Sequence, residues 1–290
     1  MRRFYIRRIL RIWPLYFLGI VVGVGYALIF HRYADVRGFV WYLLLVGNVY
    51  CGLFSPPANP MTSLWTISIE EQFYLIWPWA ARQLNRVGLA LCAITTIVVA
   101  NCVLFVIGKR HLDTDFGPWT NTFVQFEMFA TGVLLALRCR SRQFSAPATG
   151  LMLAALGPVL WFTSCLVFHA KEPPLMGTSV NGLSLAVGYA LFAIGCACVL
   201  QGFCLVGSSA IPRWLARLGR ISFGLYVYHV IGLSLGNAVV IHAAGSVYWA
   251  GRFVVALVAT IAAALVSYEY IESPFLRLKR KFEYLHSRPI

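Results

Sequence analysis

The chain has 290 residues, of which 60% are hydrophobic, 15% are aromatic and only 12% are charged, and its formal net charge is +14. Soluble domains are usually about 45–50% apolar and about 25% charged, so this composition excludes an ordinary soluble domain. The basic residues stand in short clusters between apolar runs, a pattern that sets membrane orientation and argues against a nucleic-acid-binding protein. Composition therefore predicts an all-α, polytopic integral membrane bundle that forms one domain over residues 1–290.

Nine apolar segments are long enough to be considered as membrane helices. In chain order they cover residues 12–30, 38–54, 64–81, 87–108, 120–137, 148–169, 181–207, 221–243 and 248–271. The first of them lacks a small-x-small cleavage site, so we expect it to be retained rather than removed as a signal peptide. None of the eight cysteines has the spacing of zinc ligands, and no metal or permanently bound cofactor is expected.

The basic clusters predict how many of these segments cross. If all nine crossed from a cytoplasmic N-terminus, the arginines at 138–142 and 213–220 would face outside, against the positive-inside rule. If one of the first three segments does not cross, 18 of the 24 Lys and Arg residues face the cytoplasm. We therefore predict about eight crossings in the inner membrane, with both termini cytoplasmic.

Residues 64–81 form the best candidate for the segment that does not cross, because Glu70 and Glu71 interrupt an apolar run that Pro78 closes. Proline disfavours helix at the residue before it, which predicts a kink or stop near Trp77 and a re-entrant or tilted segment. In a helix, one face carries Glu70 and, one turn later, Tyr74, which we assign to the substrate lining. Glu70 is either an active-site acid or an acid near the membrane interface, and spacing alone leaves both open.

The first basic cluster reads R-R-F-Y-I-R-R-I-L-R and ends at Arg11. Arg8 and Arg11 are three residues apart, so their guanidinium groups converge on one side of a helix. Such groups bind phosphate bidentately and suit the phosphates of a nucleotide-like acyl carrier on the cytoplasmic side. Contact with lipid headgroups, or simple orientation of the chain, is the alternative.

Ser222, Tyr226 and His229 stand at helical spacing in L-G-R-I-S-F-G-L-Y-V-Y-H, which predicts a polar stripe that faces the bundle interior. Tyr226 and His229 can meet, whereas Ser222 is about 10 Å from His229 along the axis. Histidine titrates near neutral pH, so His229 is the natural general base, although a hydrogen-bonded packing histidine fits the same pattern.

Other acids lie inside or next to apolar segments. Glu127, in V-Q-F-E-M-F-A-T-G, should face the bundle interior, either as part of a substrate lining or as a structural hydrogen-bond partner of a neighbouring helix. Glu269 and Glu272 precede a basic tail, and there we expect an interfacial salt bridge.

Five blocks of the sequence resemble, in order, those of the integral-membrane acyltransferase-3 family, which O-acylates surface glycans and other acceptors. The blocks are F-Y-I-R-R-I-L-R-I-W-P-L-Y at 4–16, S-L-W-T-I-S-I-E-E-Q-F-Y-L-I-W-P at 63–78, F-E-M-F-A-T-G at 126–132, L-G-R-I-S-F-G-L-Y-V-Y-H at 218–229 and E-S-P-F at 272–275. Together they cover nearly the whole chain, and the second and fourth are specific. The resemblance implies one acyltransferase-3-like transmembrane domain over 1–290.

The resemblance also implies roles for single residues. Arg8 and Arg11 match the R-x-x-R positions that serve the acyl-CoA side, Glu70 matches the acid of its block, and Tyr226 and His229 match the late Tyr…His helix. Family members usually begin with two further helices that carry the histidine generally assigned as catalytic. Met1 stands directly before the R-x-x-R block, so we expect this chain to be N-terminally incomplete relative to the family.

We therefore predict a membrane O-acyltransferase that transfers an acyl group, expected to be acetyl, from cytoplasmic acyl-CoA to a hydroxyl of a surface or lipid-linked glycan. The predicted catalytic residues are His229, Glu70 and Tyr226, and Arg8 and Arg11 bind the donor. The predicted lining residues are Tyr74, Glu127 and Ser222, and the expected partners are acyl-CoA, a glycan acceptor and membrane lipid. A transporter or flippase, or an inactive truncated family member, remains as an alternative.

Overall fold

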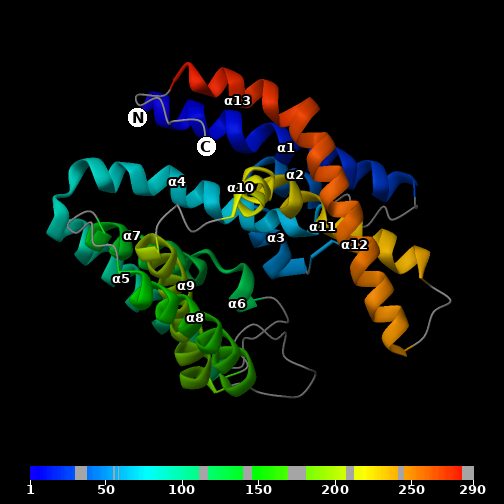
Figure 1. The fold of residues 1–290 in the computed structure, drawn as a ribbon. Helices are drawn as coiled ribbons and strands as arrows, with labels where there is room; N and C mark the ends of the chain where they lie inside the picture. The colour runs from blue at the N-terminus through cyan, green and yellow to red at the C-terminus, as the bar shows by residue number, and fades with distance from the viewer. Residues whose placement is uncertain are drawn as a thin grey trace. The chain divides into compact units, whose positions relative to one another are not determined.

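A computed structural model describes residues 1–29, 38–54, 56–57, 59–110, 117–139, 146–168, 181–206, 212–240 and 245–282. All regular structure in these ranges is helical, which confirms the predicted all-α fold (Figure 1). The chain divides into two compact units: unit 1 has Met1–Gly47, Pro57–Ile67 and Arg213–Ile290, and unit 2 has Asn48–Pro56 and Ser68–Pro212. Arg140, Arg142 and Arg288, three of the residues behind the predicted orientation, lie outside the described ranges.

Five helices of the described part are long and apolar enough to cross a membrane. They are α1 (Arg2–Ile29), α5 (Arg86–Arg110), α8 (Pro147–Phe168), α9 (Gly182–Val206) and a continuous helix made of α12 (Gly245–Ser267), the π-helical turn η4 (Tyr268–Glu272) and α13 (Ser273–Arg280). A sixth is obtained if α10 (Arg213–Arg220) and α11 (Ser222–Val239), bent by 72°, count as one span. The protein is therefore a multi-pass membrane protein, while eight crossings stay a prediction.

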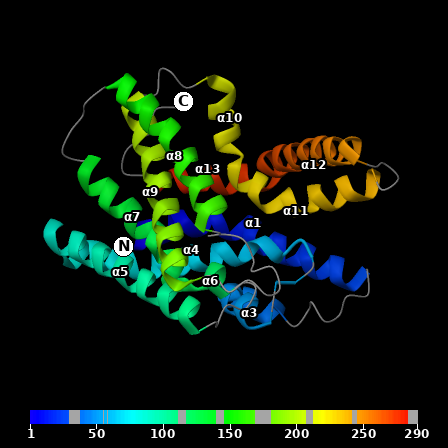
Figure 2. The same cartoon turned by 90° about the horizontal axis from the view of Figure 1, so that it is seen from below.

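Unit 1 is built on α1. This helix packs against α13 and α11, and α11 forms an antiparallel hairpin with α12, as the views in Figures 1 and 2 agree. The Arg7 Nη1 donates a hydrogen bond to the Phe282 carbonyl at 2.9 Å, so the start of α1 and the end of α13 lie at the same end of the unit.

Residues 38–54, predicted as one membrane segment, are broken into α2 (Phe39–Leu43) and α3 (Gly47–Phe54). The Val46 amide bonds to the Trp41 carbonyl at 2.9 Å and the Leu45 amide to the Tyr42 carbonyl at 3.0 Å, which is the hydrogen-bond pattern of a Schellman end. Leu45 has φ 59°, a left-handed conformation that glycine usually adopts at this position. This helix end does not follow from apolarity, so sequence length alone could not place it.

The predicted stop near Trp77 is wrong, because α4 (Trp65–Gln83) is one helix that continues through Pro78. The kink stays a prediction. Irregular backbone stands instead before α4, in a turn over residues 59–61 and the 3₁₀ turn η2 (Thr62–Leu64). There the Met61 amide bonds to Asn59 Oδ1 at 2.8 Å, and a Cβ at Gly23 of α1 would lie only 2.7 Å from the Met61 Cβ. The non-helical backbone therefore packs tightly on α1, where protein rather than lipid surrounds it.

Unit 2 is a bundle of α5, α7 (Thr122–Cys139), α8 and α9, joined by α3, most of α4 and α6 (Gly117–Thr120). Helices α8 and α9 approach closely because glycines face each other. A Cβ at Gly157 would lie 2.7 Å from the Gly195 carbonyl oxygen, and one at Gly202 would lie 2.7 Å from the Gly150 carbonyl oxygen. Small residues at such crossings let helix backbones pack in the absence of a hydrophobic driving force.

The part of α4 in unit 2 runs from one end of this bundle to the other. Near its start, Gln72 is joined to Thr122, the first residue of α7, by a hydrogen bond of 2.7 Å. Phe73 then stacks on Phe129 with ring centroids 4.6 Å apart. After α4 ends, Arg86 donates to the Leu137 carbonyl near the end of α7. Helices α4 and α7 therefore advance in the same direction, and whether 64–81 crosses a membrane stays a prediction.

Candidate active site

The arginines of the first basic cluster lie in the first three turns of α1. Arg7 is held by the end of α13, and the Arg8 guanidinium lies over the Phe4 ring at 5.7 Å from its centroid. Arg11 is exposed. The predicted role of Arg8 and Arg11 in phosphate binding stays a prediction.

Glu272 lies beside this cluster. It is only 6% exposed, and within the described residues its Oε1 has no hydrogen-bond partner. The charge of Arg11 acts on this carboxyl group, and a Cβ at Gly224 of α11 would lie 3.2 Å from Oε1. We expected Glu272 to pair with the basic tail at an interface, but the π-helical turn rotates it into unit 1 toward α1. Such π-bulges recur at functional sites.

Tyr226 and His229 meet on α11, as predicted, with ring centroids 5.5 Å apart. The Tyr226 hydroxyl donates to the Ser63 carbonyl of η2 and also bonds with the Thr66 hydroxyl of α4. The phenol therefore ties α11 to the irregular turn before α4. These bonds give the Tyr226 hydroxyl a structural role in unit 1, and its predicted catalytic role stays a prediction.

The imidazole of His229 has a defined orientation. Its Nδ1 bonds to the Tyr226 carbonyl of the same helix. A carbonyl oxygen only accepts hydrogen bonds, so Nδ1 carries the proton in the neutral ring and Nε2 carries the lone pair. Within the described ranges Nε2 has no hydrogen-bond partner, and the ring is half-buried. His229 thus presents the group that a general base requires.

Ser222, the third member of the predicted stripe, is exposed at the start of α11 and does not join the pair. Positions along α1 give the separation between the arginines and the Tyr226–His229 pair. A Cβ at Gly19 would lie 3.3 Å from a Val227 Cγ1, so the Tyr226–His229 region lies at the level of Gly19. Gly19 is about 12 Å along the helix axis from Arg11.

Glu70 and Tyr74 belong to unit 2, and they interact as their spacing predicted. The Tyr74 hydroxyl donates to Glu70 Oε1 at 2.5 Å, and both side chains are half-buried. The phenol therefore stabilises a carboxylate that would be costly in an apolar surrounding. Their predicted catalytic and lining roles stay predictions.

Glu127 fits the structural alternative that its sequence left open. It is 1% exposed, and Asn101 Nδ2 of α5 donates to its Oε1 at 3.0 Å. Its charge also acts on the Tyr189 phenol of α9. The bond to Asn101 connects α7 with α5, which agrees with the structural alternative, and the predicted lining role stays a prediction.

Sequence reasoning missed a polar network in unit 2. Asn48 is 1% exposed and exchanges hydrogen bonds with Gln72 of α4 and Thr122 of α7. Asn48 and Gln72 both stand inside predicted apolar segments, which is a signal for function or structure in membrane helices. These polar residues could have been noticed in the sequence. Their partner Thr122 is 50 residues after Gln72 and 74 after Asn48, so it could not be inferred from spacing.

These features define a class: an all-helical, multi-pass membrane protein with arginines at one end of a helix and a tyrosine–histidine pair about two turns deeper. The sequence profile of the acyltransferase-3 family, described as an acyltransferase domain, matches residues 1–269. The chain belongs to this family. No solved structure shows significant similarity to it.

Three curated relatives are similar to this chain over most of its length. The putative peptidoglycan O-acetyltransferase YrhL of Bacillus subtilis is 27% identical over 94% of this chain and 45% of its own length. Nodulation protein 10 of Rhizobium leguminosarum bv. viciae is 27% identical over 95% of this chain and 76% of its own length. The peptidoglycan O-acetyltransferase OatA of Listeria monocytogenes is 24% identical over 94% of this chain and 46% of its own length. The chain therefore spans less than half the length of the two peptidoglycan relatives.

Proposed function

We propose that the chain is a membrane O-acyltransferase that moves an acyl group, expected to be acetyl, from cytoplasmic acyl-CoA to a hydroxyl of a surface or lipid-linked glycan. Family membership and the names of the peptidoglycan relatives support this reaction class. The single observation that carries it is the orientation of His229, whose Nδ1 is occupied by its own helix and whose Nε2 is left as a proton acceptor.

In this proposal the acceptor hydroxyl attacks the thioester carbonyl carbon. The new C–O bond forms, the C–S bond breaks, and the hydroxyl proton passes to His229 Nε2 and then to the departing thiolate, which gives the ester and free CoA. Attack also creates an oxyanion, which needs hydrogen-bond donors. The Ser63 hydroxyl and the side-chain Nδ2 of Asn59 are buried and have no hydrogen-bond partner among the described residues, so they are the candidate donors in unit 1.

Arg8 and Arg11 bind the phosphates of the donor. In CoA a long pantetheine arm separates the phosphates from the thioester, so the two ends of the donor require two separated sites. The separation of about 12 Å along α1 between Arg11 and the level of the Tyr226–His229 pair agrees with this requirement. By the positive-inside rule the arginine end faces the cytoplasm, where acyl-CoA is available.

The test uses the full chain in lipid nanodiscs with labelled acetyl-CoA. Arg8→Ala combined with Arg11→Ala should weaken donor binding about ten-fold or more, because two charge-assisted contacts are lost. The matched control, Arg2→Ala with Arg3→Ala, removes the same charge from the same helix and should leave binding within about two-fold. Equal losses in both pairs would overturn the assignment of the arginines.

His229→Gln tests the base. The variant should bind donor normally and lose acyl transfer by about 100-fold or more, the usual contribution of a general base. Unchanged transfer would overturn the role of His229. Donor binding by the unmodified chain without any transfer to glycan would favour the inactive family member instead.

A further inference from the structure

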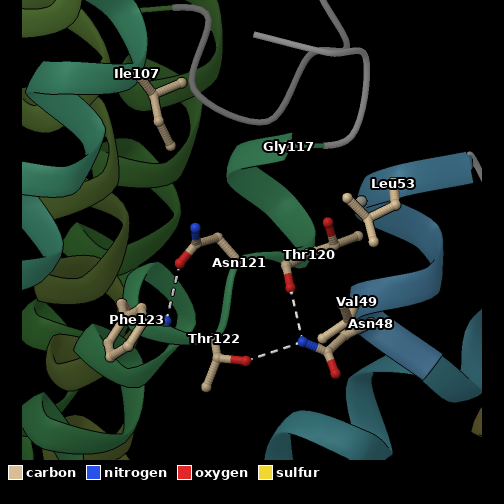
Figure 3. A pocket seen from close by; sticks show the side chains of 10 residues that line it. Asn48, Val49, Leu53, Ile107, Gly117, Thr120, Asn121, Thr122 and Phe123 are labelled. Carbon is tan, nitrogen blue, oxygen red and sulfur yellow. Dashed lines mark hydrogen bonds between the residues drawn. The ribbon is translucent and has the colours of Figure 1, made fainter. Parts of the chain in front are cut away.

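A cavity of about 390 Å³ lies in unit 2, where α5 ends and α7 begins (Figure 3). Its lining comes from α3, α5, α6 and the start of α7. Ligand pockets usually have volumes of about 300–1,000 Å³, so a single sugar ring can be accommodated. We infer that this cavity binds a neutral saccharide, which in the proposed function is the acyl acceptor.

The chemistry of the lining selects the ligand class. Its polar side chains are amides and hydroxyls, those of Asn48, Thr120, Asn121 and Thr122, and the rest of the lining is apolar or glycine. No ionisable side chain lines the cavity within the described residues, whereas phosphates and carboxylates are usually bound by Arg or Lys. A sugar presents uncharged hydroxyls on a ring with apolar C–H faces, which matches amides and hydroxyls set among Val49, Leu53, Ile107 and Phe123.

The floor of the cavity is rigid. Asn48 Nδ2 donates to the Thr120 carbonyl and to Thr122 Oγ1, each at 2.9 Å. Gln72 Nε2 donates to Asn48 Oδ1 at 2.9 Å, and the Thr122 hydroxyl donates to Gln72 Oε1 at 2.7 Å. These bonds close a ring of three side chains, so the groups around the cavity are held before a ligand arrives.

Asn121 supplies a free donor at the wall. Its Oδ1 accepts from the Phe123 and Val124 amides at 3.0 and 3.3 Å, which caps α7. Its Nδ2 has no partner within the described residues, and in Figure 3 this nitrogen points away from the cap toward the side of Ile107. A cap that occupies one atom of the amide thus orients the other for a ligand hydroxyl.

Gly52 keeps the opposite wall open. A Cβ at this position would lie 2.8 Å from Thr120 Oγ1, so any larger residue would displace that hydroxyl. The glycine therefore allows α3 to approach the Thr120 hydroxyl while both still line the cavity. The Asn121 amide then lies in the same lining as this hydroxyl.

The position of the cavity agrees with a glycan acceptor. It lies at the end of unit 2 opposite Arg86, which donates to the Leu137 carbonyl next to Arg138. More basic residues stand at that far end than at the cavity end. The far end has Arg82, Arg86 and Arg138, and the sequence there continues with Arg140 and Arg142, whereas the cavity end has Lys109 and Arg110. The positive-inside rule makes the arginine end cytoplasmic and the cavity end external, where surface glycans are found. In this orientation α4 crosses together with the bundle, so another of the first three segments has to be the one that does not cross.

The experiment measures binding of a neutral N-acetylglucosamine tetramer to the full chain in nanodiscs by calorimetry, and acceptor and donor KM values in acetyl transfer. Asn121→Asp keeps the helix cap, since aspartate caps as well as asparagine, but removes the Nδ2 donor. It should weaken tetramer binding about ten-fold, the effect of one lost hydrogen bond to a ligand, and leave acetyl-CoA binding unchanged. Val49→Trp, which fills the cavity, should abolish tetramer binding, whereas Leu91→Trp on an exposed face of α5 should not alter it.

Two results would overturn the inference: no tetramer binding by the unmodified chain, or tetramer binding by the Asn121→Asp and Val49→Trp variants that is as strong as that of the unmodified chain. Failure of the proposed function is distinguishable from these. Tetramer binding that depends on Asn121 in a chain without acetyl transfer would keep the site and remove the reaction. Acetyl transfer whose acceptor KM is the same in both variants as in the unmodified chain would support the proposed reaction and refute the role of the cavity.

Discussion

The electrostatic interaction between Arg11 and Glu272 predicts an asymmetric effect on stability. Glu272 is 6% exposed, whereas Arg11 is exposed, and the Arg11 charge acts on the buried carboxyl group. Arg11→Ala removes the charge that favours the ionised form of this buried carboxyl group, which should cost up to about 1–3 kcal/mol of unfolding free energy. We expect the lower half of this range, since solvent screens the exposed guanidinium.

Glu272→Gln has the opposite expectation. The amide has the same shape and removes a buried charge whose Oε1 has no hydrogen-bond partner within the described residues, while Arg11 remains solvated. The substitution should therefore be neutral or stabilising by up to about 1 kcal/mol. In the double variant, Arg11→Ala should cost almost nothing, so the two changes should couple by about 1 kcal/mol.

The assay is reversible unfolding of the full chain in mixed micelles, followed by tryptophan fluorescence, for the two single variants and the double variant. Glu269→Gln is the matched control, because Glu269 is exposed in the same π-helical turn, and it should change stability by less than about 0.5 kcal/mol. Additive effects of Arg11→Ala and Glu272→Gln would refute the reasoning. The double variant also tests donor binding in a chain that is not destabilised, which separates the role of Arg11 in phosphate binding from its role in folding.

Three further changes have definite expectations. Gly157→Val should destabilise the chain by about 1–3 kcal/mol in the same unfolding assay, since a Cβ there would lie 2.7 Å from a carbonyl oxygen of α9; an unchanged stability would mean that α8 and α9 are further apart. Glu127→Gln should keep acetyl transfer within about three-fold, because Gln still accepts a hydrogen bond from Asn101. Glu127→Ala should lower the unfolding free energy by about 2–4 kcal/mol. Loss of transfer in a stable Gln variant would support the predicted substrate-lining role. Tyr226→Phe should cost about 1 kcal/mol and reduce transfer by less than about ten-fold, while a loss as large as that of His229→Gln would make the tyrosine catalytic.

Several site contacts could be predicted because they are local in the chain. Glu70 with Tyr74, and Tyr226 with His229, are one turn apart on single helices, and helical spacing alone brings such pairs together. The burial of Glu127 could also be predicted, because an acid in an apolar helix has to face other helices. The structure added the partner, Asn101, which agrees with the structural interpretation, while the lining role stays a prediction.

Other features could not be predicted, because they depend on backbone conformations that apolar periodicity does not show. The break of residues 38–54 depends on a left-handed Leu45, and the helical path through Pro78 depends on packing that propensity does not include. The burial of Glu272 beside Arg11 needs a π-helical turn, which no simple periodicity reveals.

The sequence by itself determined the class of molecule and its family. Apolar length and clustered basic residues are additive properties of the chain, and blocks that resemble those of the family, such as R-x-x-R, stand in one order whatever the packing. Only the tertiary structure decided which polar groups are left with free donors and acceptors. His229 Nε2, the buried Ser63 hydroxyl and the amide of Asn121 differ from other polar groups solely in what already binds their neighbouring atoms. That difference arises from hydrogen bonds made in the folded state, so it becomes visible only when the fold is known.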